Sequence, residues 1–207
     1  MKQNNHMKFI GITGGIGAGK SRVLEFIGRH YKCEIYLADE VAHTVKLPGT
    51  ECFQSLTELL GEDILDADGQ IDKAVMADKI FKEAKLLKKV NDIIHPAVKK
   101  FLLQKYEAAK NGGSVELFFV EAALLIEDGY GELVDEMWYI HAEESVRRQR
   151  LTDSRSYSDE KISRIMGQQL TEEVFRKESD FIIDNSGSFE DTCRQIEKKL
   201  EAYTWQE

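Results

Sequence analysis

The sequence predicts an α/β protein in which a five-stranded parallel sheet is flanked by helices. Short runs rich in β-branched and aromatic residues alternate with segments of helical periodicity, the pattern of strands joined by helical crossovers. A glycine-rich segment follows the first of these runs directly, as in loops that connect a strand to a helix. The chain has 207 residues, 42% of them hydrophobic and 31% charged, which suits one domain with a large core.

The predicted strands lie, in order, at residues 8–13, 34–38, 115–120, 137–141 and 181–184. In three predicted helices, apolar residues recur at helical spacing, so each has one apolar face. The last of them begins at Ser188 and Asp191, which have the spacing of a capping box. The apolar faces are formed by Val23, Ile27 and Tyr31, by Val98, Leu102 and Tyr106, and by Phe189, Cys193, Ile196 and Leu200.

Two helical stretches interrupt the alternation and define the expected domain organisation. We expect a single domain over residues 7–207 whose core comprises residues 7–39, 111–142 and 179–207. Residues 40–110 form a helical insert and residues 143–178 a lid segment, both at the carboxyl edge of the sheet, where open α/β folds bind ligands. Residues 1–6 are polar and are expected to be a disordered lead-in.

Charge and cysteine usage exclude several classes of protein. The net charge is −9, from 28 basic and 37 acidic residues, which argues against a general binder of nucleic acids or anionic membranes. Cys33, Cys52 and Cys193 are widely separated and odd in number, so they predict reduced thiols in a cytoplasmic protein. The apolar stretch 117–126 is interrupted by Glu121 and is too short to cross a bilayer.

Residues 14–21, Gly-Gly-Ile-Gly-Ala-Gly-Lys-Ser, match the phosphate-binding pattern G-x-x-x-x-G-K-[ST]. The loop contains Gly14, Gly17, Ala18 and Gly19. Its glycines permit a tight turn in which successive backbone N–H groups point at a polyphosphate. The helix that begins near the end of the motif adds the positive end of its dipole. We therefore predict a site for a nucleoside triphosphate in a P-loop NTPase fold.

The last residues of this phosphate-binding loop supply side-chain chemistry. Lys20 can reach the β- and γ-phosphates, and the Ser21 hydroxyl can ligate Mg²⁺. The backbone N–H of Arg22 is placed to meet the α-phosphate. A nucleoside triphosphate and Mg²⁺ are the ligands that this pattern predicts.

Asp39 directly follows the second predicted strand, on the rim that also bears the phosphate-binding loop. A carboxylate there suits a general base, because an alcohol acceptor benefits from a group that accepts its proton, whereas a phosphate monoester does not need one. The alternative is that Asp39 is only the N-cap of the next helix.

Residues 145–165 contain six basic and three acidic residues, a net of +3, which leaves −12 for the rest of the chain. A basic helical segment on an acidic protein favours a lid whose arginines neutralise transferring phosphates. A solvated helix face with alternating charges is the alternative.

Taken together, these motifs resemble those of the dephospho-CoA kinase family, over residues 8 to about 200. Residues 12–21 are similar to the family's loop almost letter for letter, and Asp39 falls at the second acid of its Asp-Ala-Asp. His95-Pro96 would by itself indicate a helix-ending turn. The further matches, in order, are Asp68-Gly69 with Ile71-Asp72, His95-Pro96, Leu124-Leu125 with Glu127, Arg164-Ile165 with Gln168, and residues 183–187.

Four positions depart from the family pattern, and they bear on how the substrate is positioned. The residues of the proposed chemistry, Lys20, Ser21 and Asp39, are retained. The departures are Leu37 for the first acid of Asp-Ala-Asp, Arg22 for a hydroxyl residue, Ala123 where proline is usual and Ser156 where an acid is usual.

The resemblance implies transfer of a phosphoryl group from ATP to the ribose 3′-hydroxyl of dephospho-CoA, giving coenzyme A and ADP. Asp39 would deprotonate that hydroxyl, while Lys20 and a Mg²⁺ ion held by Ser21 would neutralise the phosphates. Among the lid arginines Arg147, Arg150 and Arg155, Arg150 is favoured for stabilising the transferring group. The remaining expected roles are Glu121 orienting a Mg²⁺-bound water, Asn185 lining the adenine pocket, and His95 and Leu124 contacting the acceptor.

Two other functions stay open at this point. One is a kinase of the same fold acting on another nucleoside or nucleotide, and the other is a nucleotide-binding regulatory module without turnover. The expected partner is dephospho-CoA as a small-molecule substrate, with no nucleic acid and no membrane. The chain is expected to be a monomer or a weak homo-oligomer.

Overall fold

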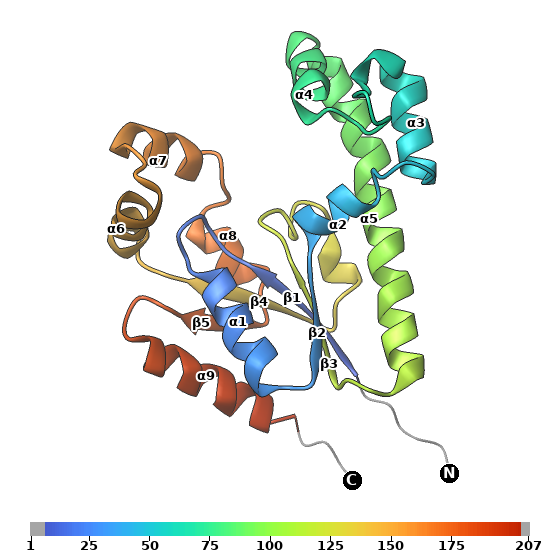
Figure 1. Cartoon of the computed structure of the whole chain (residues 1–207). Coiled ribbons are helices and arrows are strands. Elements are labelled where there is room, and N and C mark those ends of the chain that lie inside the picture. Colours follow the sequence, from blue (N-terminus) through green and yellow to red (C-terminus); the bar gives the residue numbers. More distant parts are fainter. Residues whose placement is uncertain (1–6, 204–207) are drawn as a thin grey trace. The chain divides into compact units, whose positions relative to one another are not determined.

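The computed structural model describes residues 7–203, so the predicted lead-in at residues 1–6 lies outside the described part. The chain divides into two compact units. One, which we call the sheet unit, comprises Met1–Ile35 and Ala109–Glu207, and the other, the helical unit, comprises Tyr36–Ala108 (Figure 1). The helical unit covers nearly the same residues as the insert expected at 40–110.

The sheet has five strands in the order β2-β3-β1-β4-β5 and is parallel, as predicted. In the register, Ile12 lies opposite both Glu121 and Trp138, so β1, β3 and β4 all end at the same edge. The predicted bounds of β1 and β5 are confirmed, whereas those of β2, β3 and β4 were wrong by one or two residues, because backbone pairing and not side-chain type sets them. The strands are β1 (Lys8–Thr13), β2 (Cys33–Leu37), β3 (Leu117–Glu121), β4 (Glu136–His141) and β5 (Phe181–Asp184).

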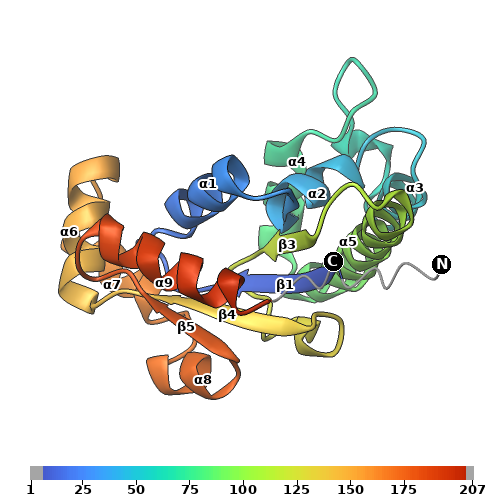
Figure 2. The same ribbon diagram turned by 90° about the horizontal axis from the view of Figure 1, so that it is seen from below.

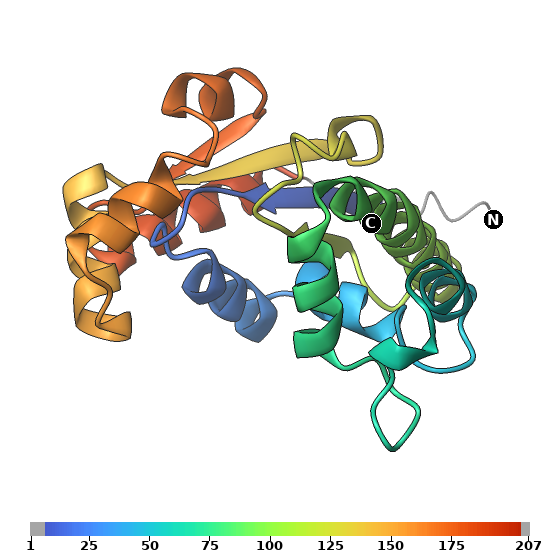
Figure 3. The same cartoon turned by 90° about the horizontal axis from the view of Figure 1, so that it is seen from above.

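Helices cover both faces of this sheet. Figures 2 and 3 show α1 and α9 on one face and α8 on the other. The Ser188 side chain caps α9 by accepting the N–H of Asp191, which confirms the predicted start of this helix. The elements are α1 (Lys20–His30), η2 (Tyr130–Glu132), α6 (Glu144–Arg155), α7 (Asp159–Met166), α8 (Glu172–Lys177) and α9 (Phe189–Glu201).

The core of the sheet unit is built on the central strands. Their side chains are buried on both faces, as expected for a parallel sheet between helices. Phe118 meets Phe9 edge to face at 5.0 Å between ring centroids, and Phe119 meets Trp138 at 5.8 Å. Burying each of these rings stabilises the fold by roughly 1.5–3 kcal/mol.

The helical unit is built from α2 (Ala38–Thr44), α3 (Glu51–Leu60), η1 (Glu62–Ile64), α4 (Lys73–Lys82) and most of α5 (Ala84–Gly112). The side chains of Thr50 and Asp72 cap α3 and α4 by accepting backbone N–H groups of the first turn. Its core includes Leu56, Ile64 and Leu102, which are at most 1% exposed.

Two expectations about helix ends were wrong. His95-Pro96 does not end a helix: α5 runs through Pro96, which removes one backbone N–H donor from the helix. Asp39 is not an N-cap, because α2 begins at Ala38 with Leu37 in the capping position. Among the helices of residues 7–203, none combines the length and apolar character needed to cross a membrane.

Candidate active site

The phosphate-binding loop leaves β1 after Thr13 and turns into α1 at Lys20. Its turn depends on glycine at two positions in particular. At Gly14 (φ 147°) a Cβ atom would lie 2.5 Å from the carbonyl oxygen of Ile140. Gly19 adopts a left-handed conformation (φ 96°) as the N-cap of α1. Because L-residues rarely adopt these backbone angles, the sequence spacing of the motif dictates the loop shape.

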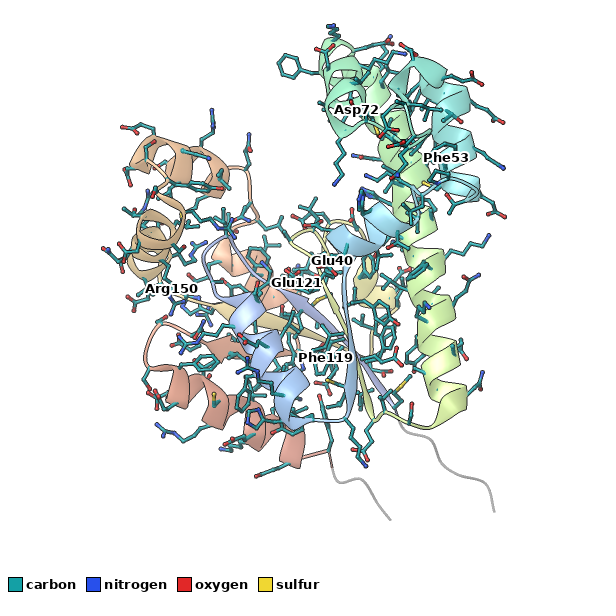
Figure 4. The ribbon with its side chains drawn as sticks, viewed as in Figure 1. Glu40, Phe53, Asp72, Phe119, Glu121 and Arg150 are labelled. Carbon is teal, nitrogen blue, oxygen red and sulfur yellow. The ribbon has the colours of Figure 1, made fainter. Side chains whose placement is uncertain are left out.

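Lys20 lies across this loop. Its ammonium donates to the carbonyl of Gly14 (2.8 Å) and lies 3.4 Å from a carboxylate oxygen of Glu121, the last residue of β3 (Figure 4). The two side chains are only 14% and 20% exposed. The structure therefore brings together Lys20 and Glu121, which sequence reasoning had assigned to the phosphates and to a magnesium-bound water.

Arg147, in the first turn of α6, packs against the phosphate-binding loop. A Cβ atom at Gly17 would lie 2.9 Å from the carbonyl oxygen of Arg147, and one at Gly15 would collide with its guanidinium. Arg147 Nε is buried and has no hydrogen-bond partner within the described residues. A buried donor of this kind calls for an acceptor from outside the described chain, such as a ligand or a water molecule.

Arg150 follows one turn later on α6 (Figure 4) and also contacts the loop. Its guanidinium donates to the carbonyls of Ala18 (3.3 Å) and Asn185 (2.8 Å). Burial, and then the neighbouring guanidinium of Arg22, lower the pKa of Arg150 from its usual value. Within residues 7–203, no carboxylate lies at ion-pair distance from Arg147 or from these two arginines. Three uncompensated cations beside one loop form a site for a polyanion.

Asn185 braces the loop from the end of β5. Its buried amide donates to the carbonyl of Ala18 (2.7 Å) and accepts the hydroxyl of Thr192 (2.9 Å). The structure thus places Asn185 in a supporting contact with the loop. Its contact with adenine stays a prediction.

Gln169 is a residue that sequence reasoning missed. Its side-chain oxygen accepts the N–H of Ile16 (2.9 Å), one of the N–H groups of the phosphate-binding loop. The family resemblance points to Gln168, which is exposed, whereas its neighbour is half-buried. In the sequence, only the position of Gln169 next to Gln168 could have indicated this contact.

Arg22 differs from its expected geometry. Its backbone N–H donates to the carbonyl of Gly19 (3.1 Å), so this group is engaged within the loop in place of being free for an α-phosphate. Its guanidinium lies 3.8 Å from the ring centroid of Phe189, in a cation–π contact. This contact joins α1 to the start of α9.

Two predicted site residues of the sheet unit, Arg155 and Leu124, make no hydrogen bond or ion pair with the loop among the described residues. Arg155 is exposed, at the end of α6, with its guanidinium 6.0 Å from the ring of Tyr157. Leu124 lies in the turn after β3 and is 48% exposed. Asp39 and His95 belong to the helical unit, where Asp39 is exposed in the first turn of α2.

Ser21 and Glu121 fit a magnesium ion by the chemistry of their donors. Ser21 is exposed at the second position of α1, and Glu121 ends β3. Within residues 7–203, no three His, Cys, Asp or Glu side chains gather into a metal cage. One hydroxyl and one carboxylate are the few oxygen ligands that Mg²⁺ takes from a protein when phosphates and water complete its shell.

Comparisons with known proteins point to one family. The family model described as dephospho-CoA kinase matches residues 8–191. A dephospho-CoA kinase of Carboxydothermus hydrogenoformans is 35% identical over 97% of this chain and 97% of the relative. The corresponding kinase of Corynebacterium diphtheriae is 32% identical over 97% of this chain and 96% of its own length.

Solved structures share the fold. A Thermus thermophilus protein superposes with a TM-score of 0.77 at 26% identity, covering 96% of this chain and 99% of its own. A Campylobacter jejuni dephospho-CoA kinase gives a TM-score of 0.70 at 21% identity, covering 93% and 95%. A shikimate kinase of Acinetobacter baumannii gives 0.55 at 12% identity, covering 98% and 97%, which extends the fold to another kinase.

Proposed function

The chain belongs to the dephospho-CoA kinase family, and from this premise we propose that it transfers the γ-phosphoryl group of ATP to the ribose 3′-hydroxyl of dephospho-CoA. The observation that supports this most directly is the phosphate-binding loop with uncompensated Arg147 and Arg150 beside it. The products are coenzyme A and ADP.

In the proposed mechanism the sheet unit binds and neutralises the triphosphate. Lys20 exchanges its bond to the Gly14 carbonyl for the β- and γ-phosphates, and Arg147 and Arg150 stabilise charge on the transferring group. When a phosphate oxygen accepts the N–H of Ile16, it displaces the side-chain oxygen of Gln169 from that hydrogen bond. Because Gln169 belongs to the lid segment, nucleotide binding and lid movement are coupled.

Asp39 acts as the general base in this proposal. It orients the acceptor hydroxyl and removes its proton as the oxygen attacks phosphorus. Ser21 and Glu121 would hold Mg²⁺, which, when bound, supplies charge neutralisation across the β- and γ-phosphates. Closure of the lid segment would exclude water and suppress hydrolysis of ATP.

We further propose that the enzyme acts in the cytoplasm as a monomer or weak homo-oligomer, with Cys33, Cys52 and Cys193 as thiols. All three are free cysteines. Burial raises the pKa of Cys33 to about 11 and that of Cys52 above its usual value. These two thiols are therefore protonated and unreactive at neutral pH.

The test of the reaction is the rate of ADP formation, measured in a coupled assay. The assay contains ATP and one acceptor at a time: dephospho-CoA, adenosine or a member of a panel of nucleoside monophosphates. We expect dephospho-CoA to be preferred. Preference for another acceptor would replace this proposal by a different kinase of the same fold. ATP binding with no acceptor-dependent ADP release would indicate a regulatory module.

The test of the base is Asp39→Asn, with Glu40→Gln as a matched control in the same first turn of α2. Both residues are exposed, so neither change should affect folding. Asp39→Asn should reduce kcat by roughly 10²-fold or more and leave the affinity for ATP unchanged. Full activity of Asp39→Asn would remove Asp39 from the mechanism.

A further inference from the structure

A second cluster of basic side chains lies in the helical unit, around a small pocket between α2 and α4. The pocket is lined by His43 from the last turn of α2, Lys46 just beyond it, and Lys73 at the start of α4. Gln70 adds an amide, and the other lining residues are Leu47, Pro48, Ile71 and Met76. Its lining therefore has three basic side chains and no carboxylate.

Lys46 is in an unfavourable environment within this pocket. Its side chain is half-buried, and among the described residues no carboxylate or carbonyl accepts a bond from its ammonium. Burial, and then the ammonium of Lys73, lower the pKa of Lys46, while Cys52 acts weakly in the opposite direction. A half-buried cation facing a second cation costs stability unless an anion joins them.

Lys79 is a half-buried lysine of the same unit whose charge is compensated by neighbouring groups. Its ammonium donates to the carbonyl of Leu60 and pairs with Asp63 at 2.5 Å. Asp72, labelled in Figure 4, provides no such partner for Lys73, because its carboxylate accepts the N–H groups of Ala74 and Val75 at the start of α4. The lysines of the pocket are thus left without the compensation that Lys79 has.

The dimensions of the pocket match an anionic oxygen group. The space open to water-sized groups is about 30 Å³, which is room for one or two phosphate oxygens. It opens to solvent, so the rest of a larger anion can remain outside. Met76 adds a buried apolar side chain to the lining, and apolar surroundings strengthen the attraction between ammonium groups and an anion.

We propose that Lys46, Lys73 and His43 form a phosphate-binding subsite that holds the diphosphate group of the acceptor substrate. The assignment to the acceptor rests on the proposed function, since dephospho-CoA contains a diphosphate between its two halves. The subsite itself rests only on the pocket and its uncompensated cations. A free phosphate compound is the other source of the same chemistry, and the experiment separates the two.

The binding measurement uses the full chain with its phosphate-binding loop saturated by a non-hydrolysable ATP analogue and Mg²⁺. Titration calorimetry with pyrophosphate then reports the second site alone. Lys46→Gln and Lys73→Gln should each weaken pyrophosphate binding about tenfold or more, whereas Lys89→Gln, an exposed lysine of α5, should not change it. Equal affinity in all four proteins would overturn the subsite.

The kinetic measurement identifies the source of the phosphate. If the acceptor occupies the subsite, Lys46→Gln and Lys73→Gln raise KM for dephospho-CoA about tenfold and leave kcat and KM for ATP unchanged. Weakened pyrophosphate binding with an unchanged KM would overturn the acceptor assignment and identify a free phosphate compound as the ligand. A chain that binds pyrophosphate as expected but does not phosphorylate dephospho-CoA would refute the proposed function while retaining the subsite.

Discussion

The two cationic sites of this protein are built in different ways. Around the phosphate-binding loop, most polar groups already have partners: the Ala18 carbonyl accepts from Asn185 and Arg150, and the Ile16 N–H donates to Gln169. In the pocket of the helical unit, Lys46 has no such partner within the described residues. The first site is a preorganised backbone cradle, and the second relies on side-chain charge that becomes favourable only when an anion arrives.

This difference predicts opposite responses to mutation. Changes at the loop should lose catalysis or stability, because they remove contacts that exist before the ligand binds. Changes at the pocket should lose affinity and gain stability, because they remove charges that the fold alone does not compensate.

The largest effect should follow Lys20→Met. Since Lys20 lies across the loop and is the proposed partner of the β- and γ-phosphates, we expect kcat to fall by roughly 10³-fold. Lys198→Met, an exposed lysine of α9, is the control. Steady-state kinetics check the result, and a loss below tenfold would show that the arginines of α6 neutralise the phosphates without Lys20.

Glu136→Gln tests a half-buried charge that, unlike Lys46, is fully partnered. Its carboxylate forms an ion pair with Lys199 (2.8 Å) and accepts hydrogen bonds from the Tyr203 hydroxyl (2.6 Å) and the Trp138 indole (3.1 Å). Burial alone would raise the pKa of Glu136, but these hydrogen bonds outweigh it and lower the pKa. We expect Glu136→Gln to lower the free energy of unfolding at pH 7 by about 1–3 kcal/mol.

The pH dependence of that difference has a definite sign. Because the pKa of Glu136 is lower in the folded than in the unfolded state, its contribution is present above the unfolded value of about 4.3. It is lost as the pH falls below that value and through the folded pKa. Urea unfolding of both proteins from pH 7 to pH 3.5 should show the difference shrinking, and a constant difference would contradict this account.

Asn185→Ala tests the brace on the loop. We expect KM for ATP to rise by about tenfold, the effect of losing roughly 1.4 kcal/mol, because the carbonyl of Ala18 loses the shorter of its two side-chain hydrogen bonds and keeps only that from Arg150. Thr192→Val, which removes only the hydroxyl that holds the Asn185 amide, should have a smaller effect in the same direction. The double variant should cost less than the sum of the two single variants, because both act through one contact.

The smallest effect, and the one of opposite sign, should come from Lys46→Met. This change removes a half-buried cation without a partner and retains the apolar stem. We expect the free energy of unfolding to rise by about 0.5–1 kcal/mol, measured by urea unfolding without phosphate. A decrease of 1 kcal/mol or more would show that Lys46 has a structural role and would remove the contrast between the two sites.

The sequence predicted the sheet and the phosphate-binding loop well for a physical reason. Strand type and order follow from local periodicity, and the loop follows from glycines whose backbone angles other residues rarely adopt. The ends of elements were less certain, as at Leu37 and Pro96, because hydrogen-bond pairing decides where a helix begins or ends.

By itself, then, the sequence determined the fold class, the position of the phosphate-binding loop and the family to which the chain belongs. Tertiary structure alone decided that Gln169 reaches Ile16, that Thr192 holds Asn185, and that Lys46 meets Lys73. These partners lie between 7 and 153 residues apart. No local pattern encodes such pairs, because they form only where packing brings separate segments to the same place.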